Sequence, residues 1–417
     1  MALMERLMAA VGYEPMRRTD AHAGWLPQGD VSQSGVSVTA SAALQYGVVQ
    51  AVLEVLGATV STLPFMVYRR TPDAREPVRD HPVSVILNDR PGPRVTAQEF
   101  WDEQTRHLAF ERNCYARILS EGGAPISGLD IIHPTRVTKI ERGPDGRVYY
   151  TINPLSTGTV ETLRDDEIWH VRKAPLTADG LRGIPVWQTG REEIGRALAV
   201  EHYGARYFRN SGKGGGTIKH PGNFRSREDR EEFLENWRRS TTGDNQHRDR
   251  LLTHGADYVP NNVANDEAQF IDTLKQLEVK VARLWQMPPH RVGILDRATH
   301  SNIEHQGIDY VVHTLAPWIA AFEQAAGRDL LVGEERASLF CEFNVAGLLR
   351  GDLLARYRAY SMGRQWGWLS VNDIRRLENR PGIGLQGDRY LEPENMRRAG
   401  NRDEPGNDDE PARRPGE

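Results

Sequence analysis

Side chains that could do chemistry gather between residues 286 and 306, in the stretch QMPPHRVGILDRATHSNIEHQ. Its three histidines raise the question of a metal site, because neutral imidazole is the commonest metal ligand in proteins. On zinc-binding helices the two histidines are four residues apart. His300 and His305 are five apart, and Pro288 and Pro289 hold His290 away from both. The spacing therefore disfavours a metal site, and the sequence predicts no cofactor.

Two further motifs look like parts of enzyme sites. The glycine-rich SGKGGGT at residues 211–217 lacks the four residues that a P-loop has between its first glycine and Gly-Lys-Ser/Thr. It also follows a predicted helix and precedes a strand, which is typical of a hinge. Asp296 and Glu304 could form a carboxylate pair, but a solvated turn and a helix cap explain them equally well. No nucleophile or kinase motif occurs, so the sequence predicts no catalytic residue and a protein that is not an enzyme.

Charge and composition narrow the function classes further. The 417 residues include 53 Lys+Arg and 57 Asp+Glu, for a net charge of −4. Proteins that bind nucleic acid tightly are usually basic, so tight nucleic-acid binding over a large surface is not expected.

The cysteines and the most apolar segment bear on the cellular setting. Cys114 and Cys341 could in principle pair, but a reduced cytosolic setting is favoured. The most apolar segment, residues 47–65, contains the polar Gln50 and Glu54, and its apolar residues recur at helical spacing (Val49, Leu53, Leu56 and Val60). The segment therefore predicts a buried amphipathic helix in a soluble protein rather than a membrane span.

The first half of the chain predicts an α+β domain. A T-x-x-E capping box at Thr96 and Glu99 opens a helix near Phe100. Short β-branched or aromatic runs separated by Gly, Pro and Asp are the pattern of antiparallel hairpins. These runs are PFMVYRR before the helix and CYARIL, GLDIIH, RVTKIE, RVYYTI and DEIWHVRK after it.

Two long helices follow, one on each side of a small insert. The first is predicted over residues 186–210, and the second begins at Asn265 as its N-cap and stops at Pro288 and Pro289, which cannot continue a helix. The second helix has an apolar seam in steps of four and three, typical of helices packed side by side. Between them, a strand near TIKH, a helix over residues 226–239 and a strand at RLLTHG predict a β-α-β unit.

A third long helix is predicted from Ser301, where Ser301 and Glu304 form another capping box, and Pro317 is expected to kink it. A strand at LFCEFNV and helices over residues 351–365 and 371–378 come next. The charged tail from residue 392 is expected to be disordered. The predicted apolar stripe of the third helix is Ile308, Val312, Leu315, Ile319 and Phe322.

The order and spacing of these blocks resemble the portal-protein family of tailed double-stranded-DNA bacteriophages, of siphovirus-like type, including prophages and gene-transfer agents. The resemblance runs from about residue 36 to 388, and the chain departs from the family's usual residues at Arg112, Cys114, Ile184 and Asp373. The blocks that carry it are DHPVSVILNDRP, ERNCYARI, DEIWHVR with GLRGIPVW, EHYGARYFRNSGKGGGTIKHPG, VARLWQMPPHRVGILDRATHSNIEHQ, TLAPWIAAFEQA, CEFNVAGLLRGD and GWLSVNDIRRLEN.

The resemblance implies an α+β portal fold with defined regions along the chain. In order, they are a flexible N-terminal arm (1–35), an α+β wing (36–185), a stem helix (186–212), a β-α-β clip (213–262), a second stem helix (263–287), a tunnel loop (288–300), a kinked wing helix with a returning strand (301–349), a helical crown (350–391) and a disordered tail (392–417).

The same resemblance implies a ring, typically of twelve subunits, at a unique vertex of the virion capsid, assembled in the cytoplasm of the bacterial host. The ring is a channel through which double-stranded DNA is packaged and ejected. The partners it implies are the terminase large subunit, the head–tail adaptor, the major capsid protein and the scaffold, with no membrane. The residues expected to face DNA from the tunnel loop are His290, Arg291, Arg297, Thr299 and His300. Those expected to dock terminase or the adaptor are Arg225, Arg227, Arg230, Arg238 and Arg239.

Alternatives remain open at this point. Ordinary solvated polarity explains Arg297 and His300 as well as a DNA contact does, although functional residues favour loops. The protein could instead be a nucleic-acid-processing enzyme that uses the histidine-rich loop, or a capsid scaffold or adaptor without a channel.

Overall fold

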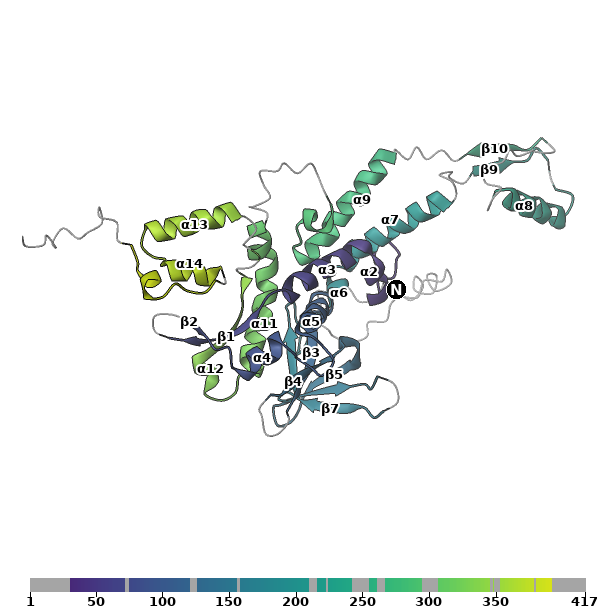
Figure 1. Cartoon of the computed structure of the whole chain (residues 1–417). Helices are drawn as coiled ribbons and strands as arrows, with labels where there is room; N and C mark the ends of the chain where they lie inside the picture. Colours follow the sequence, from purple (N-terminus) through teal and green to yellow (C-terminus); the bar gives the residue numbers. More distant parts are fainter. Residues whose placement is uncertain are drawn as a thin grey trace, which may run out of the picture. The chain divides into compact units, whose positions relative to one another are not determined.

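The computed structural model describes two compact units, one up to Val345 and one from Ala346 onward. Of the elements in the described residues, the first unit contains most of the helices and all of the strands, and the second contains α13 and α14 (Figure 1). The described residues are 31–71, 75–120, 126–155, 158–209, 216–222, 224–241, 255–260, 267–294, 307–345, 348, 353–378 and 380–391. The predicted arm (up to residue 30), the predicted charged tail, Asn265 and the capping box at Ser301 and Glu304 lie outside them.

Two buried helices form the centre of the first unit. The helix predicted within residues 47–65 is α3, whose Val49, Val52, Leu56 and Val60 are completely buried. It packs against α5, which begins with the predicted capping box between Thr96 and Glu99. No helix in the described part of the chain is long and apolar enough to cross a membrane. The helices of this region are α2 (Ala40–Gln45), α3 (Gly47–Ser61), α4 (Pro82–Asn88) and α5 (Ala97–Glu111).

The predicted antiparallel hairpins are confirmed, and each of the six runs expected in the first half of the chain forms a strand. In that half, two strands were not predicted: β2 (Arg75–Pro77) and β7 (Glu161–Arg164). The described strands form the sheets β11-β1-β2, β4-β3-β8, β5-β6-β7 and β10-β9. The remaining strands of the first three sheets are β1 (Phe65–Arg70), β3 (Asn113–Leu119), β4 (Gly128–Ile132), β5 (Val137–Arg142, preceded by the 3-10 turn Pro134–Arg136), β6 (Val148–Ile152), β8 (Ile168–Arg172) and β11 (Leu339–Phe343).

Strand β11 completes the core of the first unit, although it lies far from its partner strand in the sequence. It pairs antiparallel with β1, with Phe65 opposite Phe343. Both rings join an aromatic cluster around Trp101, whose indole nitrogen donates to the Leu87 carbonyl at 3.0 Å. The predicted strand at LFCEFNV is therefore part of the first unit's core. Cys114 and Cys341 are both buried free thiols.

The junction between α5 and β3 contains one of the departures from the family's usual residues. Arg112 has φ 57°, a left-handed conformation that favours glycine. Its guanidinium donates to the Ala174 carbonyl at 2.7 Å and lies over the Trp318 ring at 5.5 Å. These contacts help to offset the cost of a side chain in this conformation.

The first long helix is not continuous, contrary to the prediction. It is divided at Gly190 into α6 (Val186–Thr189) and α7 (Arg191–Arg209). A Cβ at Gly190 would lie 2.4 Å from a methyl carbon of Leu284, which follows the end of the neighbouring helix by two residues. That neighbouring helix, α9 (Glu267–Ala282), runs beside α7 (Figure 1). The predicted seam is confirmed at Leu277 and Val281, which are buried.

The insert between these helices has a described strand, helix and strand. They are β9 (Gly216–Lys219), α8 (Arg227–Thr241) and β10 (Asp257–Pro260). The strand that pairs with β9 is not at RLLTHG, most of which lies outside the described residues, but immediately after it. The run DYVP contains Tyr258 and Val259, residue types that favour strands. The preceding Gly255 has φ 71°, which suits a turn into the strand.

The helix after residue 307 differs from its prediction in which side chains face the core. A π-helical segment, η6 (Tyr310–Leu315), precedes α11 (Ala316–Asp329), so the interruption lies one turn before Pro317. Each π turn accommodates an extra residue, which moves Tyr310 and Val311 inward. Ile308 and Val312 are consequently half exposed, and only the later part of the predicted stripe is buried. The short helix α12 (Glu335–Ser338) then leads into β11.

The second unit contains the two predicted helices, α13 (Leu353–Gln365) and α14 (Val371–Leu377), and the 3-10 turn η8 (Leu385–Asp388). Ser370 and Asp373 form a capping box at the start of α14, with the Ser370 hydroxyl accepting from the Asp373 amide at 3.0 Å. Asp373 stands where the family usually has glutamate, and it still satisfies the cap.

Candidate functional site

The predicted tunnel loop begins from a firmly held base. After α9 the chain makes a 3-10 turn, η3 (Arg283–Trp285), and Gln286 adopts φ 56°. Trp285 is buried and its indole nitrogen donates to the Ala109 carbonyl at 2.7 Å. The Gln286 carbonyl accepts from the Thr314 hydroxyl at 2.7 Å. The helix thus ends earlier than predicted, because these two bonds stabilise the turn before the prolines are reached.

His290 and Arg291 lie on the next turn, η4 (Pro289–Val292), which ends at Gly293. Arg291 is exposed, but its guanidinium lies over the Tyr310 ring at 4.6 Å. Partial burial, and then the charge of Arg291, lower the pKa of His290. His290 is therefore neutral at pH 7, and Arg291 carries the positive charge of the described part of this loop. Arg297, Thr299 and His300 lie outside the described residues.

The predicted docking arginines separate into two groups. Arg225, Arg227 and Arg230 surround a hollow of about 540 Å³ at the start of α8. Arg227 pairs with Glu231 at 2.8 Å, whereas no ion pair joins Arg225 or Arg230 within the described residues.

The second group lies toward the other end of the helix. There the Arg239 guanidinium pairs with Glu235 at 3.1 Å. Arg238 is on the same turn of α8, but its side chain is outside the described part. The hollow therefore brings together only three of the five predicted residues.

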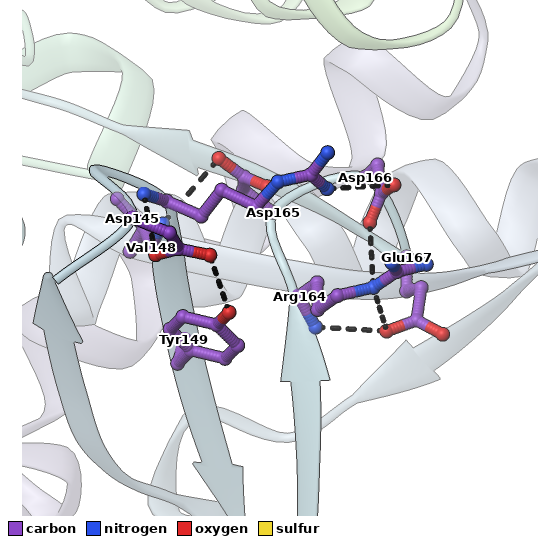
Figure 2. Close-up of polar contacts among 8 residues, drawn as sticks. Asp145, Val148, Tyr149, Arg164, Asp165, Asp166 and Glu167 are labelled. Carbon is purple, nitrogen blue, oxygen red and sulfur yellow. Dashed lines mark hydrogen bonds and ion pairs between the residues drawn. The ribbon is translucent and has the colours of Figure 1, made fainter. Parts of the chain in front are cut away.

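A cavity of about 710 Å³ lies where sheet β5-β6-β7 meets the end of α11. Arg147 on its wall pairs with Asp166 at 3.3 Å, and Arg328 pairs with Asp329 at 2.6 Å. Figure 2 shows the sheet side of this region, where Asp166 also pairs with Arg164 at 3.2 Å. These charged groups neutralise one another at the surface. Among the described residues, no three His, Cys, Asp or Glu side chains are placed to hold a metal ion.

The inner wall of this cavity contains a buried network that the sequence analysis missed. His170 Nε2 lies 3.2 Å from Asn113 Oδ1, and His170 Nδ1 lies 3.2 Å from the Tyr150 hydroxyl. The Asn113 amide nitrogen donates to the carbonyls of Glu111 and Gly183, which fixes its orientation. Its oxygen can only accept, so His170 carries its proton on Nε2 and accepts from Tyr150 on Nδ1. The available signal was the position of His170 within the otherwise apolar run IWHV, all four residues of which are buried in β8.

His170 should make the first unit sensitive to acid. Burial, and then the charges of Arg172, Arg328 and Arg182, lower its pKa well below the usual range. The unfolded chain therefore binds more protons than the folded chain below about pH 6.5, and stability falls as pH falls. Relative to a His170→Gln variant, the wild type should lose up to about 1.4 kcal/mol of unfolding free energy per pH unit between pH ~6.5 and 5.

Urea denaturation of both proteins at pH 7.5, 6 and 5 would measure this difference. His133 and His290, whose pKa values are also lowered, remain in both proteins and cancel in the comparison. Parallel pH profiles for the two proteins would contradict the assignment.

Comparison with known proteins identifies what the chain is similar to. The model of the family described as "Phage portal protein" matches residues 47–379. A probable portal protein of Streptomyces phage phiC31 is 29% identical over 388 residues, which cover 90% of this chain and 84% of the relative. The portal protein of Enterobacteria phage HK97 is 26% identical over 345 residues, which cover 82% of this chain and 80% of the relative.

Solved structures share the fold. An HK97-family phage portal protein from Corynebacterium diphtheriae aligns with TM-score 0.57 and 15% identity, over 76% of this chain and 99% of that one. A chain from the neck of a native gene transfer agent particle, computed with C12 symmetry, aligns with TM-score 0.54 and 18% identity, over 91% of this chain and 99% of that one. The mixed helix and strand content agrees with this α+β fold.

Proposed function

Because this chain belongs to the phage portal protein family, whose members are structural components of the capsid and not enzymes, we propose that its subunits form a ring-shaped channel at a unique capsid vertex. Double-stranded DNA is packaged and ejected through this channel. The observation that carries the proposal is the pairing of α7 and α9, which run side by side and bracket the small β9, α8 and β10 insert.

The two helices have the surfaces that a ring requires. One face of each is used within the subunit, where Phe270 packs near Gly204 and Tyr203. The opposite face of α9 remains exposed and includes Ile271, Asp272 and Lys275. A closed ring uses different surfaces of each subunit for its two neighbours, and paired rods with exposed outer faces are suited to this. In this proposal α7 and α9 are the stem helices.

The remaining regions take the roles that the family suggests. The sheets and helices before α6, with α11 and β11, form the wing, and α13 and α14 form the crown inside the shell. We assign the ring twelve subunits, by analogy with the gene transfer agent neck computed with C12 symmetry. The capsid protein and scaffold are the expected partners of the ring in the host cytoplasm.

The insert is the proposed clip, where the terminase large subunit and later the head–tail adaptor dock. The hollow between Arg225, Arg227 and Arg230 supports this assignment. Within the described residues, the guanidinium groups of Arg225 and Arg230 have no carboxylate partner. Guanidinium groups recognise carboxylates with two parallel hydrogen bonds. An acidic segment of the partner is therefore the expected ligand of this hollow.

The turn at His290 and Arg291 is the base of the proposed tunnel loop. A channel that moves DNA must not hold it tightly, because each strong phosphate contact would resist translocation. A neutral His290 and a single charged Arg291, held over the Tyr310 ring, meet this requirement. The chain's net charge of −4 agrees with weak rather than tight DNA binding.

Electron microscopy of the purified full-length chain tests the proposal. We expect annular particles with a central hole wide enough for a DNA duplex. Monomers or filaments alone, over a range of salt and protein concentrations, would contradict it and favour a scaffold or adaptor without a channel. Nuclease activity that is lost when His290 is replaced would instead favour a nucleic-acid-processing enzyme.

A further inference from the structure

Two cations lie against one buried indole ring in the first unit. The guanidinium carbon of Arg112 is 5.5 Å from the centre of the Trp318 ring, and the ammonium nitrogen of Lys173 is 4.7 Å from it. Trp318 is 3% exposed, whereas both cations are half-buried. The end of α5, the segment after β8 and the start of α11 therefore bring two positive charges together.

Hydrogen bonds fix the two cations relative to each other. The Lys173 amide donates to the Arg112 carbonyl at 2.9 Å, and the Arg112 guanidinium donates to the Ala174 carbonyl at 2.7 Å. The Lys173 ammonium donates to the Pro317 carbonyl at 3.0 Å. The packing around this junction is close, because a Cβ at Gly183 would lie 2.3 Å from the Arg112 carbonyl oxygen. The fold itself therefore positions both side chains.

No carboxylate neutralises these charges within the part of the chain that the structure describes. The hydrogen bonds of both side chains go to uncharged carbonyl groups, and the buried Nε of Arg112 has no hydrogen-bond partner there. Burial lowers the pKa of Arg112, and burial and then the charge of Arg112 lower the pKa of Lys173. Burying a charge is unfavourable unless a partner compensates it. The face of Trp318 compensates these two only in part.

The backbone of Arg112 also favours a role for its side chain. Its φ of 57° is a left-handed conformation, which glycine adopts without strain and other residues do not. Residues held in such conformations gather at ligand clamps and other functional sites, where the surrounding structure holds them. Glycine would remove the strain at this position but would supply no cation.

We propose that Arg112 and Lys173 together form a binding site for a phosphate group. This inference goes beyond the proposed channel and does not depend on ring formation. A phosphate group that is not a diester carries a charge of about −1.5 to −2 at pH 7 and three strong acceptor oxygens, so it matches two cations. An ammonium has three N–H donors, and Lys173 uses one of them on Pro317. The others, and the remaining guanidinium N–H groups, can donate to phosphate oxygens.

A carboxylate fits the site less well than a phosphate group does. It carries a single negative charge and has two oxygens, so one of the two cations would stay uncompensated. A phosphate group has two sources here, a free phosphate ion and the DNA backbone, in which each phosphate carries one charge. The experiment therefore has one arm for each source.

Thermal denaturation of the full-length chain at increasing concentrations of inorganic phosphate tests the site, with chloride holding the ionic strength constant. We expect phosphate to raise the midpoint of the wild type, because a ligand that binds the folded chain stabilises it. The phosphate concentration for half of this rise should be at least about tenfold higher in Arg112→Gly and in Lys173→Gln, since each loses charge-assisted hydrogen bonds. Arg112→Gly should fold, because glycine suits the φ of 57°.

A matched control separates the site from general effects of charge and salt. Lys139→Gln removes a cation of the same unit whose side chain is 61% exposed, and it should respond to phosphate as the wild type does. Equal responses of the wild type and Arg112→Gly would overturn the inference, because phosphate would then act only as a stabilising salt. An equal rise with acetate in place of phosphate would also overturn it and assign the site to carboxylates.

The second arm measures binding of a DNA duplex to the wild type and to Arg112→Gly by fluorescence anisotropy. If phosphate competes with the duplex and Arg112→Gly binds the duplex at least about tenfold more weakly, the inference holds and the DNA backbone supplies the phosphate group. If the duplex does not distinguish the two proteins but inorganic phosphate does, the inference holds and the ligand is the free ion. Because neither arm requires a ring, failure here would leave the proposed function standing.

Discussion

Replacing Trp101 by alanine should destabilise the first unit by about 4 kcal/mol, the range observed for large aromatic deletions in packed cores. Trp101 is 2% exposed, and its ring lies within 5.5 Å of the rings of Phe65, Phe100, Phe322 and Phe343. These residues come from β1, α5, α11 and β11, so the cavity would open at the point where the four elements meet. The substitution would also leave the buried Leu87 carbonyl without its donor.

Hydrogen exchange of peptides from α5 and β11 is the suitable measurement, because a chain with two units need not unfold in one step. A loss of about 4 kcal/mol should accelerate the slowest amides about 10³-fold. Trp101→Phe is the control: it keeps most of the ring and loses only the hydrogen bond, so its effect should be far smaller. Equal exchange in the alanine variant and the wild type would show that the cluster is not the unit's core.

Regular periodicity and turn chemistry were sufficient to predict much of this fold. The capping box at Thr96 is a local signal, and so are the short β-branched or aromatic runs that form β1, β3, β4, β5, β6, β8 and β11; each was confirmed. The missed strands were β2, of three exposed residues, and β7, whose four residues include one buried side chain. Such short edge strands depend on their partners more than on their own sequence.

The errors in the helices have a common cause, which is contact with a distant segment. The break at Gly190 suits the close approach of Leu284, and the π-helical turn before Pro317 shifts which side chains face the core. Neither effect is visible in a window of neighbouring residues. The same limit applies to the site: spacing indicated the loop at His290, but not that Arg291 would lie over Tyr310.

Deleting residues 291–298 should leave the rings intact and reduce packaged DNA at least tenfold, because the deletion removes the segment proposed to line the channel. The ring should survive, since the base of the loop is held by Trp285 and by the Thr314 bond to Gln286, both outside the deletion. The measurements are electron microscopy of the rings and the amount of nuclease-protected DNA per particle in an assembly assay.

The single variant Arg291→Ala separates two explanations of a packaging defect. Arg291 lies over Tyr310, which is buried on η6 and bonded through its hydroxyl to Thr59 at 3.2 Å. If Arg291→Ala alone reproduced the defect of the deletion, the contact with η6 or the single charge would be responsible, and the length of the loop would not matter. If the deletion abolished ring formation, the segment would be an interface between subunits. A deletion variant that packages DNA normally would place the DNA path elsewhere, because a channel lined by this loop cannot lose eight residues of its wall without changing how the duplex is held.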